Sequence, residues 1–67
     1  MSRRAAEQQE PLAFDVPTVA RIIDRSDRKV RELIASGHLV ARRLPGGRLL
    51  ILRDDLLAFL RNLPRLT

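Results

Sequence analysis

Two short apolar stripes separated by a polar corner constrain the fold of this chain more than any other feature. The first stripe recurs at i, i+3, i+4 and i+7, as on one face of a helix, and consists of Val16, Val19, Ala20 and Ile23. The second stripe consists of Val30, Leu33 and Ile34. Asp24 and Arg25 lie between them, and aspartate is one of the few residues besides glycine that tolerates a left-handed conformation. The pattern predicts two short helices joined by a tight corner.

The expected ends of both helices carry capping residues. Asp15 is placed as the N-cap of the first helix, with Pro17 in its first turn, where proline is tolerated. Ser26 is placed as the N-cap of the second helix, which we expect to run to about Ser36 and to stop at Gly37.

A hairpin and a third helix are expected next. Residues 39–44 and 49–52 read as strands joined by the turn Pro45-Gly46-Gly47-Arg48. The third helix begins at Arg53 or Asp54 and ends at Pro64. Its apolar stripe consists of Leu56, Phe59, Leu60 and Leu63. The predicted fold class is α+β, a small winged helix-turn-helix with three helices and a two-stranded wing.

These patterns divide the chain into three parts. Residues 1–11 are polar and unpatterned and predict a flexible arm, residues 12–63 form the winged domain, and residues 64–67 form a short tail. The expected core consists of Val16, Val19, Ala20, Ile23, Val30, Leu33, Ile34, Leu39, Leu49, Ile51, Leu56, Phe59 and Leu60. Such a small aliphatic core predicts a stability of only a few kcal/mol.

Composition excludes several classes of protein. The chain has 67 residues, no cysteine and one histidine, which rules out disulfides and a zinc site with several protein ligands. No apolar run is long enough to cross a bilayer, and the amino terminus lacks the apolar segment of a signal peptide, so we expect a cytoplasmic protein. His38 is interpreted as a surface or capping residue. With no catalytic pairing and no phosphate-binding glycine loop, neither an enzyme nor a bound cofactor or metal is expected.

The charge of the chain is strongly positive and unevenly placed. The net charge is +5 and the sequence pI is near 11.5. Residues 25–53 hold eight basic residues and only two acidic ones. The net charge of this segment, +6, therefore exceeds the +5 of the whole chain. An arginine-rich composition explains why arginine replaces lysine, but not why the charges gather on the second helix and the hairpin. Such clustering indicates a polyanionic partner, double-stranded DNA above all.

The second helix has the pattern of a DNA recognition helix. Arg28, Glu32 and the small Ala35 lie opposite its apolar side, with Lys29 and Arg31 on the flanks. Arg28 suits a guanine edge and Glu32 a cytosine amino group, whereas Lys29 and Arg31 suit phosphates. The candidate DNA-binding residues of this helix are Ser26, Arg28, Lys29, Arg31 and Glu32. The alternative is a solvated helix face with an Arg28–Glu32 ion pair.

The hairpin has the pattern of a DNA-binding wing. Gly46-Gly47 permits a sharp reversal that places Arg48 at or near the tip, where a guanidinium suits a narrow minor groove. The candidate DNA-binding residues of the wing are Arg42, Arg43, Gly46, Gly47 and Arg48. The alternative is an ordinary hairpin with arginines on its solvent face.

Residues 14–60 resemble the small MerR-like winged-helix proteins known as excisionases, the recombination directionality factors of phages. The resemblance rests on Val19-Ala20 and the following Ser26, on Val30 to Gly37, on Gly46-Gly47-Arg48, and on Arg53-Asp54 leading to Phe59-Leu60. Asp24 stands where the family has a corner glycine, and Lys29 stands where threonine is common.

The resemblance implies a function without chemistry of its own. An excisionase binds sites on attachment-site arms, bends the DNA and directs a tyrosine integrase toward excision. It implies that Arg28 and Glu32 face bases and that Arg48 enters the minor groove. Because only residues 62–67 follow the third helix, we expect a monomer in free solution, with neighbouring copies cooperating on DNA. The alternatives are a small MerR-like transcriptional regulator, and an adaptor whose basic face binds an acidic protein.

Overall fold

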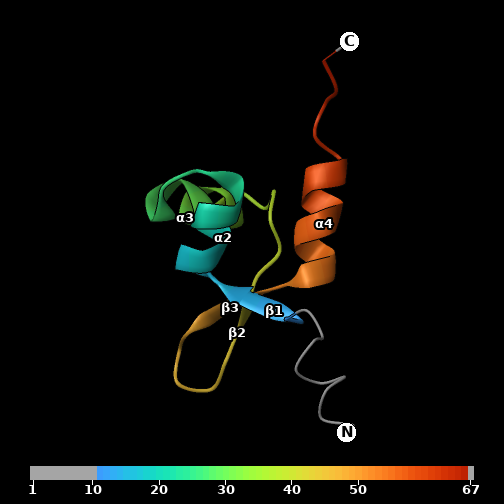
Figure 1. The fold of residues 1–67 in the computed structure, drawn as a ribbon. Helices are drawn as coiled ribbons and strands as arrows, with labels where there is room; N and C mark the ends of the chain where they lie inside the picture. Colours follow the sequence, from blue (N-terminus) through green and yellow to red (C-terminus); the bar gives the residue numbers. More distant parts are fainter. Residues whose placement is uncertain (1–10, 67) are drawn as a thin grey trace, which may run out of the picture.

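The computed structural model describes residues 11–66 and has a mixed helix and sheet architecture (Figure 1). Its elements in chain order are β1 (Ala13–Asp15), α2 (Val16–Ile23), α3 (Asp27–Ala35), β2 (Arg42–Arg43), β3 (Leu49–Leu52) and α4 (Arg53–Arg61). Helices α2 and α3 lie together on one side, and α4 stands apart from them. The β2–β3 hairpin extends from the sheet in the direction away from the helices. This arrangement confirms the predicted winged helix-turn-helix. The predicted arm lies, apart from residue 11, outside the described residues.

Both ends of α2 follow from its sequence. Asp15 has extended backbone and its Oδ1 accepts a hydrogen bond from the backbone N–H of Thr18 at 3.0 Å, which confirms the predicted N-cap. Asp24 is left-handed, with φ of 60° and ψ of 48°. The N–H of Arg25 donates to the carbonyl of Ala20 at 2.8 Å, closing a Schellman-type end. The tight corner is therefore built on aspartate.

Helix α3 repeats this design with a glycine. Ser26 caps it as predicted, because its Oγ accepts from the N–H of Lys29 at 3.1 Å. The helix ends at Ala35, and Gly37 takes a positive φ of 85°. The N–H groups of His38 and Leu39 both donate to the carbonyl of Leu33, at 2.9 and 3.1 Å. These bonds turn the chain back under the helix and bury Leu39.

The sheet differs from the predicted two-stranded wing. It has three antiparallel strands in the order β1-β3-β2, with Phe14 opposite Ile51 in one pair and Arg43 opposite Leu49 in the other. The three residues of β1 were too few to show an alternating pattern. The predicted strand over residues 39–44 is also wrong, since β2 contains only Arg42–Arg43. The bonds of residues 38 and 39 to α3 occupy the start of that segment.

The core contains every residue that the apolar pattern predicted for it, together with two more. In the described part of the chain, the buried residues are Val16, Val19, Ala20, Val30, Leu39, Ile51 and Leu56. The other predicted core residues pack against this cluster, as do Phe14 and Ala41, which the pattern did not indicate. Helix α4 begins at Arg53, as expected, but ends at Arg61. Leu63 therefore lies beyond the helix and is 47% exposed, so its assignment to the helical stripe was wrong. Within the described residues no helix is long and apolar enough to cross a membrane.

Candidate nucleic-acid interface

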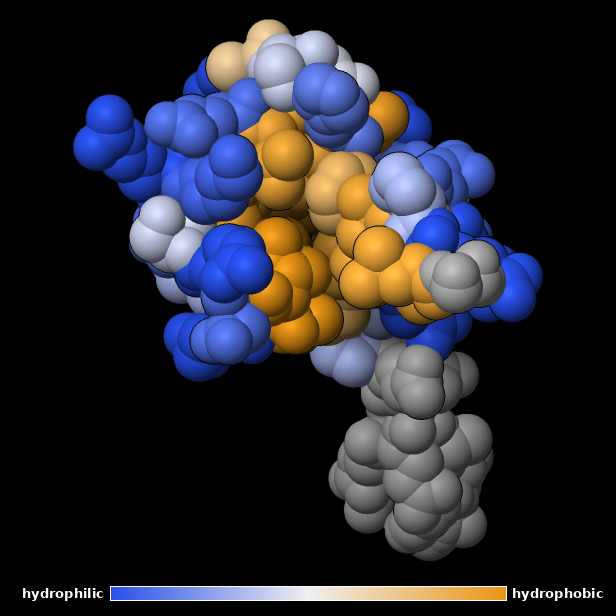
Figure 2. Space-filling model, turned by 90° about the horizontal axis from the view of Figure 1, so that it is seen from above, coloured by the Kyte–Doolittle hydropathy of each residue, from blue (hydrophilic) through white to orange (hydrophobic). Residues whose placement is uncertain are grey.

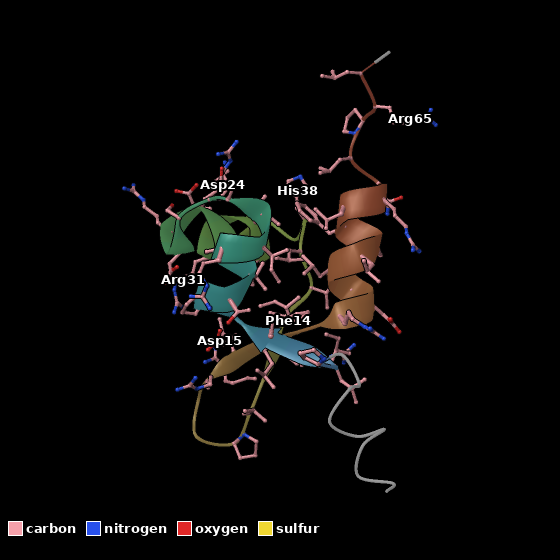
Figure 3. All side chains as sticks on the ribbon, viewed as in Figure 1. Phe14, Asp15, Asp24, Arg31, His38 and Arg65 are labelled. Atoms are coloured by element: carbon pink, nitrogen blue, oxygen red, sulfur yellow. The ribbon has the colours of Figure 1, made fainter. Side chains whose placement is uncertain are left out.

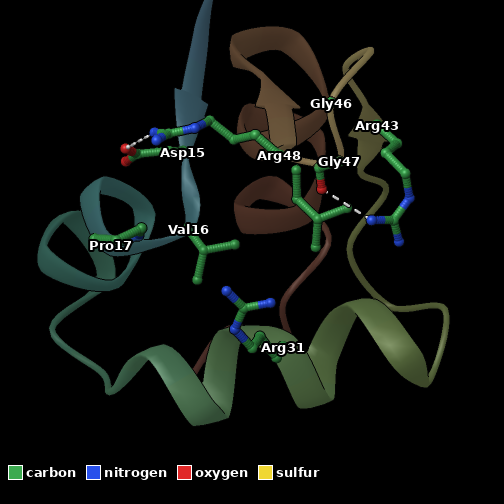
Figure 4. A pocket seen from close by; sticks show the side chains of 9 residues that line it. Asp15, Val16, Pro17, Arg31, Arg43, Gly46, Gly47 and Arg48 are labelled. Atoms are coloured by element: carbon green, nitrogen blue, oxygen red, sulfur yellow. Dashed lines mark hydrogen bonds and ion pairs between the residues drawn. The ribbon is translucent and has the colours of Figure 1, made fainter.

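A groove with three arginines on its walls lies between α3 and the hairpin (Figure 4). Its volume is about 510 Å³. The lining consists of Asp15, Val16 and Pro17 from the start of α2 and its cap, Arg31 from α3, and Arg43, Gly46, Gly47, Arg48 and Leu49 from the hairpin. We call this the basic groove. The helix-turn-helix and the wing are thus the two walls of one concave surface.

Arg48 closes the hairpin loop and turns its side chain back toward the helices. The N–H of Leu44 donates to the carbonyl of Arg48 at 2.8 Å, which leaves residues 45–47 at the apex. The Arg48 guanidinium lies 3.4 Å from Oδ2 of Asp15, and its side chain is 67% exposed. The sequence placed Arg48 at or near the tip. The structure places it at the base of the turn, inside the basic groove.

Asp15 has a second role that the sequence did not reveal. One carboxylate oxygen caps α2 and the other faces Arg48, thirty-three positions away in the chain. Hydrogen bonding to the side chain and backbone of Thr18, followed by the charges of Arg48 and Arg21, lowers the pKa of Asp15 below its ordinary 3.8. Asp15 is therefore an anion at neutral pH beside the wing guanidinium.

The other two wing arginines point in different directions. Arg43 donates from its guanidinium to the carbonyl of Gly47 at 2.9 Å and braces the turn. Gly46 and Gly47 have φ values of 103° and 101°, a region that other residues adopt only with strain. Arg42 lies on the opposite face of the strand, 3.8 Å from Oδ2 of Asp55 in α4. The structure thus brings Arg43 and Arg48 to the basic groove and Arg42 away from it.

The outer face of α3 carries an exposed charge cluster. Glu32 lies 3.4 Å from Nε of Arg28 and 3.9 Å from Nζ of Lys29. The side chains of Arg28 and Glu32 are 88% and 55% exposed, so this pair contributes little stability and its members are accessible to a ligand. The intrahelical pair considered as the alternative interpretation does form. Ser26 is occupied as a cap, and Arg31 turns to the basic groove on the other flank.

His38 has a local partner and lies outside this surface. Its Nδ1 is 2.7 Å from Oγ of Ser36, which also donates to the carbonyl of Leu33 at 3.2 Å. The histidine therefore belongs to the C-terminal end of α3, in agreement with a surface or capping role.

Comparison with protein families decides the class of this interface. The model of a family described as "Helix-turn-helix domain" matches residues 13–64, more than three quarters of the chain. The chain belongs to this helix-turn-helix family. No curated protein and no solved structure matches the chain.

As a helix-turn-helix domain, the chain is a DNA-binding module, and its surface fits that activity. A protein of this class inserts its second helix in the major groove and places flanking cations on phosphates. Here the exposed face of α3 and the basic groove adjoin along one side of the molecule, and Arg31 lies between them (Figure 3). Asp15 is the residue that sequence reasoning missed. Only the pairing of β1 with β3, which sets Asp15 opposite Leu50, brings it next to Arg48.

Proposed function

We propose that this helix-turn-helix domain is an excisionase, which binds and bends DNA at attachment-site arms and directs a tyrosine integrase toward excision. The proposal rests on the resemblance of residues 14–60 to excisionases and on one structural observation. That observation is the basic groove, which joins the recognition helix to an arginine-bearing wing. Two basic elements on one concave surface suit a protein that contacts the DNA backbone while its helix lies in the major groove and its wing in the minor groove.

We assign the residue roles from their positions along this surface. Arg28 and Glu32 lie on the outermost face of α3 and read base edges, and their mutual ion pair opens when DNA replaces it. Lys29 and Arg31 contact phosphates on either side of the helix. Arg48 leaves Asp15 to enter the minor groove, while Arg43 keeps the turn in shape. Ser26, Gly46 and Gly47 hold the two elements in their conformations, and Arg42 contributes charge from the far face of the wing.

The partners follow from the proposed role. They are double-stranded DNA at the attachment-site arms, neighbouring copies of the chain on that DNA, and a phage integrase. One short helix and one wing cover few base pairs, which is too little for a highly specific site, so several copies must act together.

An excision assay tests this proposal. A tyrosine integrase gene and its attachment sites are first located in the genome that encodes the chain. A plasmid then carries a reporter flanked by those sites, and the integrase is expressed with or without the chain. We expect excision to depend on the chain, and Arg48→Ala to reduce it. Excision that proceeds equally without the chain would contradict the proposal.

Two other outcomes would assign the protein elsewhere. Binding to a promoter with altered transcription, and no effect on excision, would make it a transcriptional regulator. A protein-binding adaptor would show no steep fall of DNA affinity with salt, whereas a protein that neutralises several phosphates must show one.

A further inference from the structure

A second groove, apolar rather than basic, opens on the other side of α3. Viewed from the end at which α4 terminates, apolar side chains gather in a hollow that hydrophilic residues surround (Figure 2). Its volume is about 370 Å³, and its apolar lining consists of Ile22, Ile23, Leu33, Phe59, Leu60 and Leu63. We call this the apolar groove. It separates the helix-turn-helix from α4.

The apolar groove is open to solvent rather than part of the core. Ile22 and Leu63 are 48% and 47% exposed at its margin. By contrast, Val19 of α2 and Val30 of α3 are fully buried in the core. A contiguous apolar hollow with a polar rim is a recurrent feature of surfaces that bind another protein segment. DNA offers no apolar side chain to fill it.

The rim of the apolar groove is positively charged. Its two polar lining residues are Arg25 and Lys29. The Arg25 guanidinium donates to the carbonyl of Asp24 at 2.9 Å, and Lys29 lies at the long distance of 3.9 Å from Glu32. Both cations are exposed and therefore available to a carboxylate. The charge of the chain as a whole, +5, makes a second copy a repulsive occupant of such a rim.

We propose that the apolar groove binds an acidic amphipathic segment of a partner protein. Two or three large apolar side chains of the segment fill the hollow, and Asp or Glu residues beside them face Arg25 and Lys29. The apolar floor of this site lies apart from the basic groove, and Lys29 at its rim is shared with the proposed phosphate contacts. Arg31 lines the basic groove on one side of α3, and Leu33 lines the apolar groove on the other. Because peptide binding is measured without DNA, the proposal is tested independently of the excisionase role.

Peptide selection without DNA tests the proposal. A displayed library of random dodecapeptides is selected against the full immobilised chain, and enriched peptides are synthesised and titrated into the ¹⁵N-labelled chain. We expect enriched sequences to combine large apolar residues with Asp or Glu, and amide shifts to gather around Ile22, Leu33 and Leu60. Ile22→Ser should weaken binding about tenfold, because an apolar contact is lost. Arg25→Glu should also weaken binding about tenfold, because the new carboxylate repels the acidic residues of the segment.

Leu57→Ser is the matched control, since Leu57 is an exposed leucine of α4, at 37%, that does not line the groove. It should leave the affinity within about twofold. Unchanged melting temperatures for Ile22→Ser and Arg25→Glu show that both variants are folded. The absence of enrichment, equal binding by Ile22→Ser, or shifts confined to Arg31, Arg43 and Arg48 would overturn the proposal. Self-association that Ile22→Ser abolishes would assign the groove to a second copy and overturn the proposed occupant.

Discussion

At the scale of single residues, Asp15 links the fold to the basic groove. Its carboxylate caps α2 through Thr18 and pairs with Arg48 of the wing. The pair is partly exposed, so its contribution to stability is small. If Arg48 enters the minor groove as proposed, this pair holds the wing cation on the protein while DNA is absent.

Asp15→Asn separates the two roles of this residue. Asparagine caps helices about as well as aspartate, so the fold should be retained while the charge facing Arg48 is lost. We expect DNA affinity to rise and the slope of log affinity against log salt to steepen by about one, because the released Arg48 guanidinium neutralises phosphate charge from the minor groove. Affinity measured across a salt series checks this. Asp54→Asn, an exposed carboxylate in the first turn of α4, makes the same change in net charge and should have a smaller effect. Equal effects of the two substitutions would contradict a specific role for Asp15.

The lowered pKa of Asp15 also predicts a pH dependence of stability. A carboxyl group whose pKa is depressed by folding stabilises the folded state above its unfolded pKa of about 3.9. That stability is lost as the pH falls through the folded pKa, which lies below 3.8. Between about pH 5 and pH 2, wild type should therefore lose more thermal stability than Asp15→Asn. Melting temperatures from circular dichroism measure the difference, and parallel losses in both proteins would refute it.

The outer face of α3 predicts a division between specificity and affinity. Arg28→Ala and Glu32→Ala should each cost about 1–3 kcal/mol for the cognate site and relax sequence preference, since each removes a base contact. Lys29→Ala should weaken all sequences alike and lower the salt slope by about one. Titrations against cognate and random duplexes distinguish these outcomes. An unchanged ratio of the two affinities in Arg28→Ala would mean that another face reads the bases.

At the scale of elements, the wing is a hairpin with two unlike faces. Strand alternation sends Arg43 to the basic groove and Arg42 toward Asp55 of α4. Two adjacent arginines that look equivalent in the sequence therefore occupy different surroundings. One face of this short strand lines the basic groove, and the other face contacts α4.

Arg48 lies in the basic groove and Arg42 lies away from it, which predicts that Arg48 matters more for DNA bending. Arg48→Ala should lower DNA affinity, reduce the bend angle and weaken a preference for A·T-rich flanks, because the minor-groove contact is lost. The free energy of unfolding should change by no more than about 0.5 kcal/mol, since Arg48 lies on the surface. Arg42→Ala removes the same charge from the same hairpin and should leave the bend nearly unchanged. Bend angles measured at saturating protein decide the matter, and an equal loss in both variants would remove the distinction between the two faces.

At the scale of the whole molecule, a small core supports a strongly positive net charge. Within residues 11–66, seven buried apolar residues join α2, α3, β3, α4 and the Leu39 segment, while the net charge of the chain is +5. Like-charged copies repel one another in solution, and DNA phosphates neutralise that repulsion. Binding to DNA should therefore bring copies together that do not associate alone.

The corresponding prediction concerns assembly. The purified chain should sediment as a monomer at micromolar concentration, and binding to a duplex with adjacent sites should be cooperative. Sedimentation equilibrium and titrations of one-site and two-site duplexes measure these properties. A stable dimer without DNA, or independent binding to adjacent sites, would show that copies recognise each other differently.

The sequence by itself determined the local structure of this protein. Apolar spacing placed the helices, and capping residues placed their ends at Asp15, Asp24, Ser26 and Gly37 to within a residue. It also identified the core and the clustered arginines. These features were readable because each depends on neighbours within one or two helical turns, whose geometry the backbone fixes.

Only the tertiary structure decided which distant residues meet. Strand β1 is too short to be recognised alone, and its pairing with β3 places Asp15 beside Arg48. The strand expected over residues 39–44 shortened because the N–H groups of residues 38 and 39 bond to α3. The separation of Arg42 from the basic groove and the opening of the apolar groove beside α4 likewise arise from packing between elements. Such contacts depend on sheet register and helix placement, which no local pattern of residues encodes.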